Sequence, residues 1–437
     1  MAQTVPTSVQ DRPAVRARRL GWGLADQVLS SLTNFGLSIL VARSVATSSL
    51  GAFGLAFTTY TITLGATRAL CSEPLSVRYS ATSPDHWEEG AALSTGAAVV
   101  LGAGACGICL MVGSAIWGTL GQSLAVMGLA MPGLIVQDTW RTAFFSRLRG
   151  SQAFMNDLVW AVAQAVFVAI VLVSGHPSTP AFIAAWGAAA NVAALYGAVQ
   201  AGRLPRPSGT WDWLTRHRDL GPRYLVEFAA RNAAQSGSMF TTAAFSGLAG
   251  AGALRGAQIA LGPLNILNIG ITAPAITEAV RIQRRSPRRM LRMVAILGAS
   301  MAILFTAWGL AMFLLPAHLG HALLRRSWAA AHPVILPYTA VMAASGALTG
   351  ATVGLRALAA SKRSMRARLI TGVLALAGAT AGAALDGAVG AASGLAVGLG
   401  VGGIQWWIQL RLAVHETESS RGPAQPGCLD GRDLVGR

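Results

Sequence analysis

The sequence predicts an all-α integral membrane protein with about twelve transmembrane helices in two six-helix lobes. Composition is the first observation behind this prediction, since only 12% of the 437 residues are charged and 53% are hydrophobic. Soluble domains carry about 25% charged residues, so most of this chain must face lipid or other helices. The other two observations are the recurrence of long apolar segments and an internal repeat.

Long apolar segments recur through the whole chain, and about 20 apolar residues are enough to cross a bilayer. In chain order the segments cover 21–43, 50–70, 90–117, 123–145, 156–174, 180–201, 223–248, 254–280, 293–315, 334–358, 367–385 and 388–410. The last two are separated by a turn expected at Asp386-Gly387. The polar ends, 1–20 and 412–437, are expected to be disordered cytoplasmic tails.

The basic residues support this segmentation. With the N-terminus inside, the expected cytoplasmic segments hold most of the 34 Lys and Arg residues, whereas the outer loops hold only Arg43, Arg255, Arg325 and Arg326. Cytoplasmic loops of membrane proteins carry such an excess, and a wrong count of spans would scramble it. The net charge of +17 therefore indicates topology, with both termini cytoplasmic, and not binding of nucleic acid.

The longest loop divides the chain into two halves. We expect an N-terminal six-helix lobe over 21–201, a cytoplasmic linker over 202–222 and a C-terminal six-helix lobe over 223–411. Within the linker, WDWLTRHRDL (211–220) mixes aromatic and charged residues in the manner of a helix that lies in the membrane interface.

The two halves resemble each other when Glu227 is placed on Asp26. In that register the matched pairs include Asp26 with Glu227, Asn34 with Gln235, Gly36 with Gly237, and Gly51-Ala52 with Gly252-Ala253. Acids and amides are sparse here, so their matches carry more weight than those of apolar residues. Two repeats of the same orientation are related by an axis along the membrane normal, with ligand sites between them. The repeat also argues that 21–43 is a retained helix and not a signal peptide.

Ionisable residues inside the apolar segments are candidate functional residues, because each costs about 2.5–3.5 kcal/mol at a helix centre. Glu227 and Arg231 are spaced i, i+4, so they share a helix face and can form an ion pair. That pair is either structural or part of a polar surface that binds an anion between the lobes. Asp26 either faces the same space or lies near the membrane surface.

A second group of ionisable residues surrounds the fourth and fifth segments. Asp138 and Arg141 are spaced i, i+3 and share a face, and Asp157 opens the fifth segment, where a carboxylate also suits the helix dipole. Arginines near helix ends can also extend to the interface without any further role. These arginines are Arg68, Arg281 and Arg356.

Motifs of catalysis are missing from the sequence. It contains no HExxH, GxSxG or Walker A motif, and its histidines and acids show no metal-ligand spacing. We therefore expect a protein that is not an enzyme, with no catalytic residue, no metal and no organic cofactor.

Two stretches resemble a known family. LTNFGLSILVARSVATSSLGAFGLAFTTYTITLGATRAL (32–70) resembles the opening of polysaccharide exporters of the multidrug/oligosaccharidyl-lipid/polysaccharide superfamily, with a Gly-x-Phe-Gly turn between two helices. QDTWRTAFFSRLRGSQAFMNDLVW (137–160) is similar to their pattern of Asp, Arg, paired aromatics, a basic loop and a second Asp. The resemblance implies a V-shaped bundle that flips undecaprenyl-pyrophosphate-linked oligosaccharides across the bacterial cytoplasmic membrane by alternating access.

The resemblance also implies roles for the ionisable residues, because guanidinium groups bind pyrophosphate and acidic sugars bidentately. The implied substrate-binding residues are Arg231, Arg141, Arg68 and Arg281. The implied orienting or coupling residues are Asp26, Glu227, Asp138 and Asp157. The expected partners are the polyprenyl-pyrophosphate-linked saccharide and the lipid bilayer, with coupling to a proton or sodium and contact with polysaccharide polymerase machinery left open.

Two alternative functions fit the same composition. A cation-coupled multidrug antiporter of the same fold would place acids in its cavity, whereas arginines are as prominent in these segments. A membrane-embedded glycosyl- or acyl-transferase would need catalytic acids or histidines in a loop at the membrane face, and the loops are short and arginine-rich.

Overall fold

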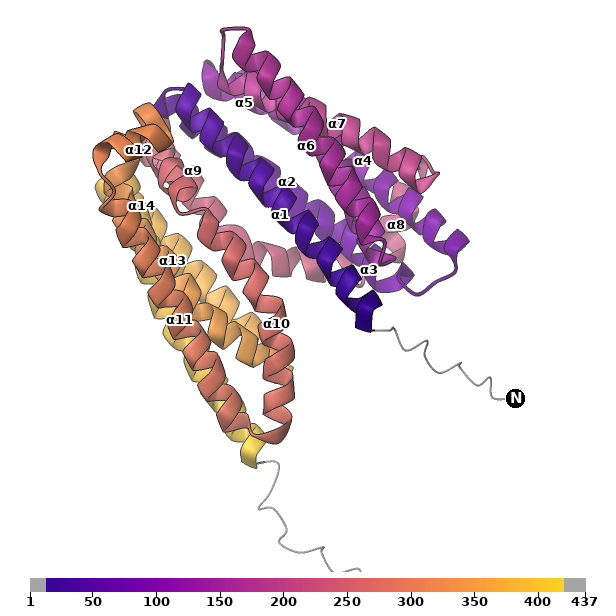
Figure 1. Cartoon of the computed structure of the whole chain (residues 1–437), viewed down its shortest axis with the longest axis vertical. Helices are drawn as coiled ribbons and strands as arrows, with labels where there is room; N and C mark the ends of the chain where they lie inside the picture. The colour runs from indigo at the N-terminus through magenta and orange to yellow at the C-terminus, as the bar shows by residue number, and fades with distance from the viewer. Residues whose placement is uncertain (1–12, 420–437) are drawn as a thin grey trace, which may run out of the picture.

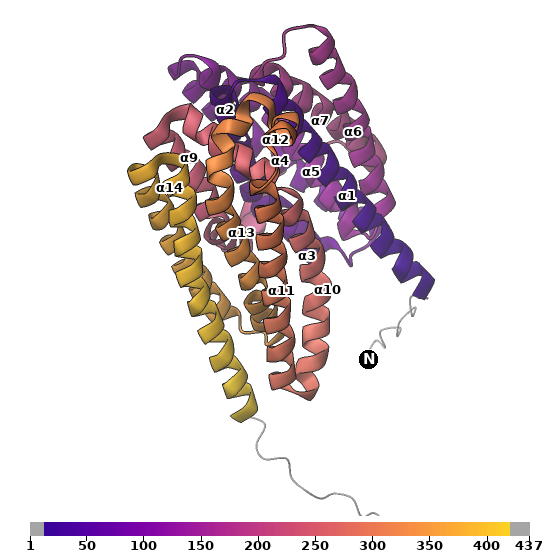
Figure 2. The ribbon, with the colours of Figure 1, turned by 60° about the vertical axis from the view of Figure 1, so that its left-hand side comes forward.

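The computed structural model describes residues 13–419, apart from the side chains of 13–20, 265, 266, 269 and 273. Within this range the chain is helical, and it forms two lobes that meet at one end and diverge toward the other (Figure 1). Figures 1 and 2 show that α1 begins and α14 ends on the side where the lobes diverge. The predicted all-α fold with two six-helix lobes is confirmed.

Six spans build the N-terminal lobe. They are α1 (Pro13–Ser44), α2 (Thr47–Thr67) with its continuations η1 (Arg68–Ser72) and α3 (Glu73–Tyr79), α4 (Pro84–Ala115), α5 (Thr119–Ser146), α6 (Gly150–Val173) and α7 (Thr179–Ala201). Segment η1 is one turn of π-helix, a local widening that is frequent at functional sites.

The C-terminal lobe also has six spans, because α9 and α14 are each broken and the second part of α9 forms one span together with α10. Its elements are α9 (Gly221–Ala260), α10 (Pro263–Arg285), α11 (Pro287–Phe313), the short α12 (Ala317–Leu324) and η3 (Arg325–Ser327), α13 (Trp328–Ala357) and α14 (Ser361–Ser419). Helix α9 breaks at Gly247 (φ 66°), where a left-handed backbone favours glycine, and α14 breaks at Asp386-Gly387 as predicted. Eight described helices are long and apolar enough to cross a membrane when each is taken singly, and α14 alone contains two spans.

The lobes touch through α2 and α9, and the contact reproduces the sequence repeat. A Cβ at Gly51 would overlap the carbonyl oxygen of Leu248, and a Cβ at Gly252 would overlap the carbonyl oxygen of Thr47. Gly51 pairs with Gly252 and Thr47 with Leu248 in the register that places Glu227 on Asp26. Small residues let membrane helices approach this closely, so the repeat supplies both halves of a near-symmetric contact.

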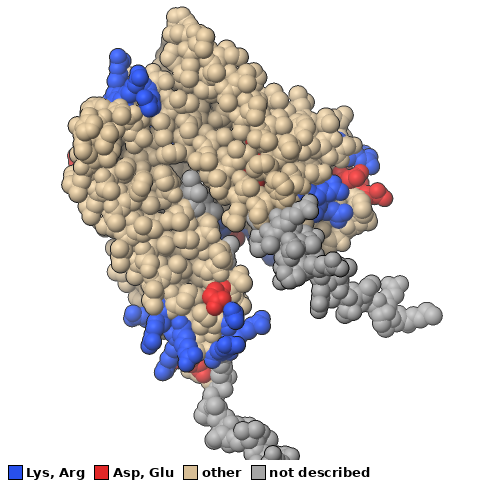
Figure 3. All heavy atoms as spheres, in the orientation of Figure 1, with Lys and Arg blue, Asp and Glu red and all other residues tan. Residues whose placement is uncertain are grey.

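The side on which the lobes diverge is rich in arginine. Figure 3 shows basic side chains gathered at the end of the C-terminal lobe and a hollow between the two lobes on the same side. The turn between α10 and α11 contributes several of them, including Arg284, Arg285 and Arg288. We call this the basic side.

The linker docks on the basic end of the N-terminal lobe. After η2 (Pro207–Gly209), α8 (Thr210–Arg216) forms a helix over the first part of the expected 211–220, and a turn follows it. The buried Trp213 donates a hydrogen bond from Nε1 to the carbonyl of Leu70 at 3.0 Å, and Arg78 of α3 pairs with Asp219 at 2.8 Å. Burial in this contact lowers the pKa of His217 below its usual range.

Several predicted boundaries and positions differ from the structure. Helix α1 begins at Pro13 and α14 continues to Ser419, so the ends of both expected tails are helical, and the remaining parts, 1–12 and 420–437, lie outside the described residues. Arg255 was assigned to an outer loop, but it lies within α9 over the ring of Phe57, at 4.6 Å.

Candidate functional site

Ionisable side chains of the N-terminal lobe meet in one group, which we call the acid cluster (Asp26, Arg68, Asp138, Arg141 and Asp157). Its carboxylates are buried, whereas the side chain of Arg68 is 42% exposed. Arg141 of α5 is its centre. Its Nε lies 3.0 Å from Oδ2 of Asp26 on α1 and 3.1 Å from Oδ2 of Asp157 on α6. The side chains of Asp26 and Asp157 are 0% and 2% exposed, so both carboxylates are inside the protein.

Arg68 and Asp138 form the second pair of the acid cluster. Nε of Arg68 donates to Oδ2 of Asp138 at 2.7 Å while Nη2 donates to Oδ1, which is a bidentate pair. Arg68 opens the π-helical turn η1, and Asp138 lies one turn before Arg141 on α5. Nη1 of Arg141 is 4.0 Å from Oδ1 of Asp138, so the two pairs are contiguous.

Buried amides hold the carboxylates in position. Gln137 donates from Nε2 to Oδ1 of Asp157 at 2.8 Å and to Oδ1 of Asn156 at 3.1 Å. Asn156 in turn donates to the carbonyl of Ala193 at 2.9 Å and to Gln200, both on α7. The network therefore joins α5, α6 and α7, and it fixes the geometry of the acids before any ligand binds.

The acid cluster has more negative than positive groups. Three carboxylates face two guanidinium groups, and within the described residues Oδ1 of Asp26 has no hydrogen-bond partner. A buried carboxylate without compensation costs several kcal/mol. With all five groups ionised, the cluster carries one negative charge in excess.

Arginines of the C-terminal lobe line an open cavity of about 440 Å³, which we call the arginine pocket. Its guanidinium groups come from three helices: Arg231 of α9, Arg356 of α13 and Arg368 of α14. Its remaining polar lining consists of Asn268, Thr272, Ser345, Thr349 and Thr352. A second cavity of about 230 Å³ continues from it past Arg356, Arg368 and Glu227.

The arginine pocket has an excess of positive charge. Nη2 of Arg231 is 2.7 Å from Oε1 of Glu227, as the i, i+4 spacing predicted, and this pair is the only one recorded for the pocket arginines within the described residues. The two side chains are 52% and 37% exposed, so they remain accessible to a ligand. One turn before Arg231, Phe228 packs against Gly65 of α2, so the pocket lies beside the lobe interface.

The structure divides the predicted site residues among three places. Arg231 and Glu227 lie at the arginine pocket, whereas Arg141 and Arg68 are taken up by the carboxylates of the acid cluster. Asp26 is inside that cluster and fully buried by protein. Arg281 lies apart from both, 71% exposed at the basic end of α10 and 3.7 Å from Glu278.

Two arginines of the pocket were missed from the sequence. Arg356 was interpreted as an arginine that extends to the interface, and Arg368 was only one of the basic residues counted in the expected cytoplasmic segments. A signal for Arg356 does exist, because Ser345, Thr349, Thr352 and Arg356 follow one another at i, i+4, i+7 and i+11. That spacing puts four polar residues on one helix face. Ser361, Ser364 and Arg368 likewise follow one another at i, i+3 and i+7, and all three line the adjoining cavity.

The fold is that of a known transporter superfamily. One similar solved structure is a multidrug resistance MATE family transporter of the MOP superfamily in an inward-facing conformation (TM-score 0.74, 12% identity, covering 90% of this chain and 96% of that chain). Another is the lipid II flippase MurJ in an inward closed conformation (TM-score 0.68, 10% identity, 91% and 87%). A third is a MOP superfamily transporter from Pyrococcus furiosus with a binding pocket of reverse polarity (TM-score 0.63, 10% identity, 92% and 96%). No protein-family model matches the sequence, and comparison with curated proteins finds no match.

These similarities define the class of the protein at the level of fold. The chain is a multi-pass membrane protein with the V-shaped fold of the MOP-superfamily transporters. The predicted resemblance to that superfamily is therefore confirmed in the fold.

Proposed function

We propose that this protein is a flippase that moves an undecaprenyl-pyrophosphate-linked oligosaccharide across the bacterial cytoplasmic membrane, with both termini cytoplasmic, for synthesis of a cell-surface polysaccharide. The arginine pocket is the observation that carries the proposal. Three guanidinium groups with one carboxylate favour a multiply charged anion. Hydrogen bonds to charged groups contribute about 1.5–3 kcal/mol each, and guanidinium groups match phosphate oxygens bidentately.

The other walls of the pocket suit the saccharide. Asn268, Thr272 and Thr349 present amide and hydroxyl groups that can hydrogen-bond sugar hydroxyls. Thr349 already donates to Oδ1 of Asn268 at 2.8 Å, which orients both side chains. A volume of about 440 Å³ is within the range of small-molecule sites. The pocket would then hold the pyrophosphate and the first sugars, leaving the polyprenyl chain in lipid.

The lobe contact suits alternating access. The backbones touch at Gly51 and Gly252, away from the basic side, while the hollow between the lobes opens on the basic side. Rocking of two repeats about such a contact exposes one central site to each side in turn. A cargo bound at the arginine pocket would enter from the cytoplasm in the state described here.

The surplus carboxylate of the acid cluster favours a second candidate, a cation-coupled antiporter of the same fold. In that function a proton or sodium ion would bind near the free Oδ1 of Asp26. The cluster is compatible with a coupled flippase as well. A cationic drug, however, would be repelled by the arginine pocket, so we favour the flippase.

A double substitution in the pocket tests the proposal. Arg231→Gln with Arg356→Gln removes two of three pocket guanidinium groups and should abolish flipping of a lipid-pyrophosphate oligosaccharide in proteoliposomes. Arg281→Gln is the matched control, because its side chain is exposed at the basic side away from the pocket, and it should retain wild-type flipping. Unchanged flipping by the double variant would overturn the proposed function.

A further inference from the structure

Two further cavities of the C-terminal lobe meet at Arg411 of α14, and the first of them shares only Leu348 with the lining of the arginine pocket. One is an apolar groove of about 340 Å³ between α13 and α14, lined by Leu348, Leu399, Ile404 and Trp407 among others. The other, of about 470 Å³, lies between the basic ends of α11 and α14 and is lined by Arg288, Arg292, Arg411, His415 and Glu418.

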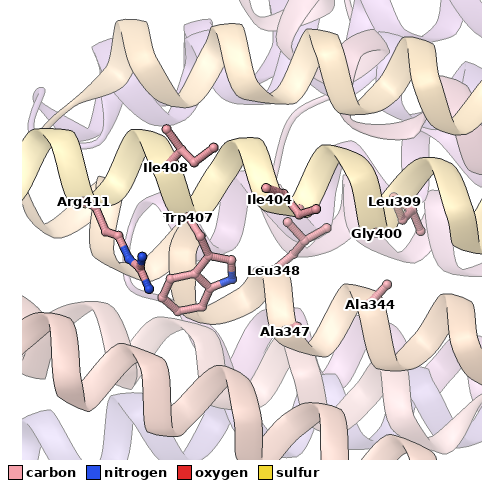
Figure 4. Close-up of a pocket in the computed structure, with 10 residues that line it drawn as sticks. Ala344, Ala347, Leu348, Leu399, Gly400, Ile404, Trp407, Ile408 and Arg411 are labelled. Carbon is pink, nitrogen blue, oxygen red and sulfur yellow. The ribbon is translucent and has the colours of Figure 1, made fainter.

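The groove has the form of a slot for a hydrocarbon chain. Trp407 and Arg411 project from the same side of α14, opposite Ala344 and Ala347 of α13 (Figure 4). Small residues make the slot: Gly400 and Gly403 of α14 face Ala344 and Ala347. From Leu399 to Arg411 the lining runs about 18 Å at 1.5 Å per residue, close to the depth of one leaflet, about 15 Å.

The basic end of the groove has the charge of a phosphate site. Glu418 is paired with Arg288, whose Nε is 3.0 Å from its Oε1. For Arg292 and Arg411, no ion pair is recorded in the part of the chain that the structure describes. Two uncompensated guanidinium groups therefore face one cavity from two helices on the basic side.

We propose that this groove binds an anionic phospholipid from the leaflet on the basic side. One acyl chain would lie along α14 from Arg411 toward Leu399, and the phosphate would bridge Arg292 of α11 and Arg411 of α14. Charge complementarity selects an anionic over a zwitterionic head group, because the cavity carries three guanidinium groups and one carboxylate. The bound lipid would tie together two helix ends of the C-terminal lobe. This site does not depend on what the arginine pocket transports.

Lipid retention by the purified full chain tests the proposal. The protein is exchanged into micelles that contain phosphatidylglycerol or phosphatidylcholine, and native mass spectrometry measures the bound lipid. The wild type should retain one phosphatidylglycerol about ten-fold more strongly than phosphatidylcholine. Equal retention of the two lipids would mean that lipids bind the apolar surface without selecting a head group, and it would overturn the proposal.

Two matched pairs of variants locate the site. Arg292→Gln with Arg411→Gln should lose the preference, whereas Arg284→Gln with Arg285→Gln, at the nearby turn on the same side, should keep it. Gly400→Phe should block the chain, because a Cβ there meets no atom within 4 Å and the ring can fill the groove. Gly104→Phe on α4 is equally free of contacts and should have no effect.

Competition separates the phospholipid from a lipid-linked substrate. Undecaprenyl phosphate should leave the bound phosphatidylglycerol in place, and it should do so in the Arg231→Gln variant as well. Displacement of phosphatidylglycerol, or loss of its binding in the Arg284→Gln and Arg285→Gln variant, would overturn the proposal. Either result would leave the flipping test of the arginine pocket unaffected.

Discussion

The two lobes share a scaffold, but the acid cluster of one lobe and the arginine pocket of the other carry an excess charge of opposite sign. At the lobe contact the repeat is kept closely, with Gly51 and Gly252 in equivalent roles. At Asp26 and Glu227, which are also repeat partners, the environments diverge. Asp26 is fully buried in a cluster with surplus carboxylate, whereas Glu227 is 37% exposed in a pocket with surplus guanidinium.

This difference suggests that the two lobes suit different kinds of ligand. A buried, pre-organised set of acids suits a small cation, because a proton or metal ion needs no large opening. An open, arginine-lined cavity suits a bulky anion that enters and leaves. The repeat is thus kept at the lobe contact, whereas the charged side chains of the two lobes have diverged.

The largest expected effect comes from breaking the acid cluster. Arg141→Met leaves Asp26 and Asp157 buried without their counter-ion, and removal of one partner of a buried pair costs about 3–5 kcal/mol. Arg231→Met, in the exposed pair with Glu227, should cost less than about 1 kcal/mol. Thermal unfolding of the two purified variants would measure the contrast. Similar stability of both would mean that the acid cluster is not a tightly coupled buried unit.

A smaller effect is expected from the lobe contact. Gly252→Val places side-chain atoms against the carbonyl oxygen of Thr47, and overpacking of this kind costs about 1–3 kcal/mol. The added valine side chain should hold α2 and α9 apart. A cysteine introduced at Ser49 should then react faster with a membrane-impermeant thiol reagent that is added on the side opposite the basic side. Gly36→Val is the control, because a Cβ there meets nothing within 4 Å. Equal reactivity in both variants would contradict the tight closure of this contact.

Much of the architecture could be predicted because bilayer thickness fixes the length of a span. The apolar segments gave all twelve spans, and even the break at Asp386-Gly387 followed from turn chemistry. The Glu227–Arg231 pair was equally predictable, since it depends only on helical spacing.

The composition of the two sites could not be predicted in the same way. Arg141 was assigned to the cavity, but helix packing brings it to Asp26 and Asp157, which lie on two other helices. Contacts between different helices depend on the tertiary structure, and they cannot be predicted from the spacing of residues along one helix. The polar helix faces that lead to Arg356 and to Arg368 were, in contrast, present in the sequence.

The smallest change that tests the comparison replaces one carboxylate oxygen by an amide nitrogen, at Asp26 in one variant and at its repeat partner Glu227 in another. Asp26→Asn keeps an oxygen to accept from Arg141 and places the amide nitrogen where Oδ1 has no hydrogen-bond partner among the described residues. The cluster then has two carboxylates for two guanidinium groups, so it no longer needs a proton or cation. The fold should persist, and transport should lose its dependence on pH or on sodium.

Glu227→Gln is the matched change in the other lobe. It removes a partly exposed carboxylate from the arginine pocket, so it should leave any dependence on pH or sodium intact and alter only the affinity for the anionic substrate. Initial rates in proteoliposomes over a series of pH values and sodium concentrations would measure both variants. If Glu227→Gln and not Asp26→Asn abolished the dependence, coupling would belong to the C-terminal lobe, and the assignment of roles to the lobes would have to be reversed.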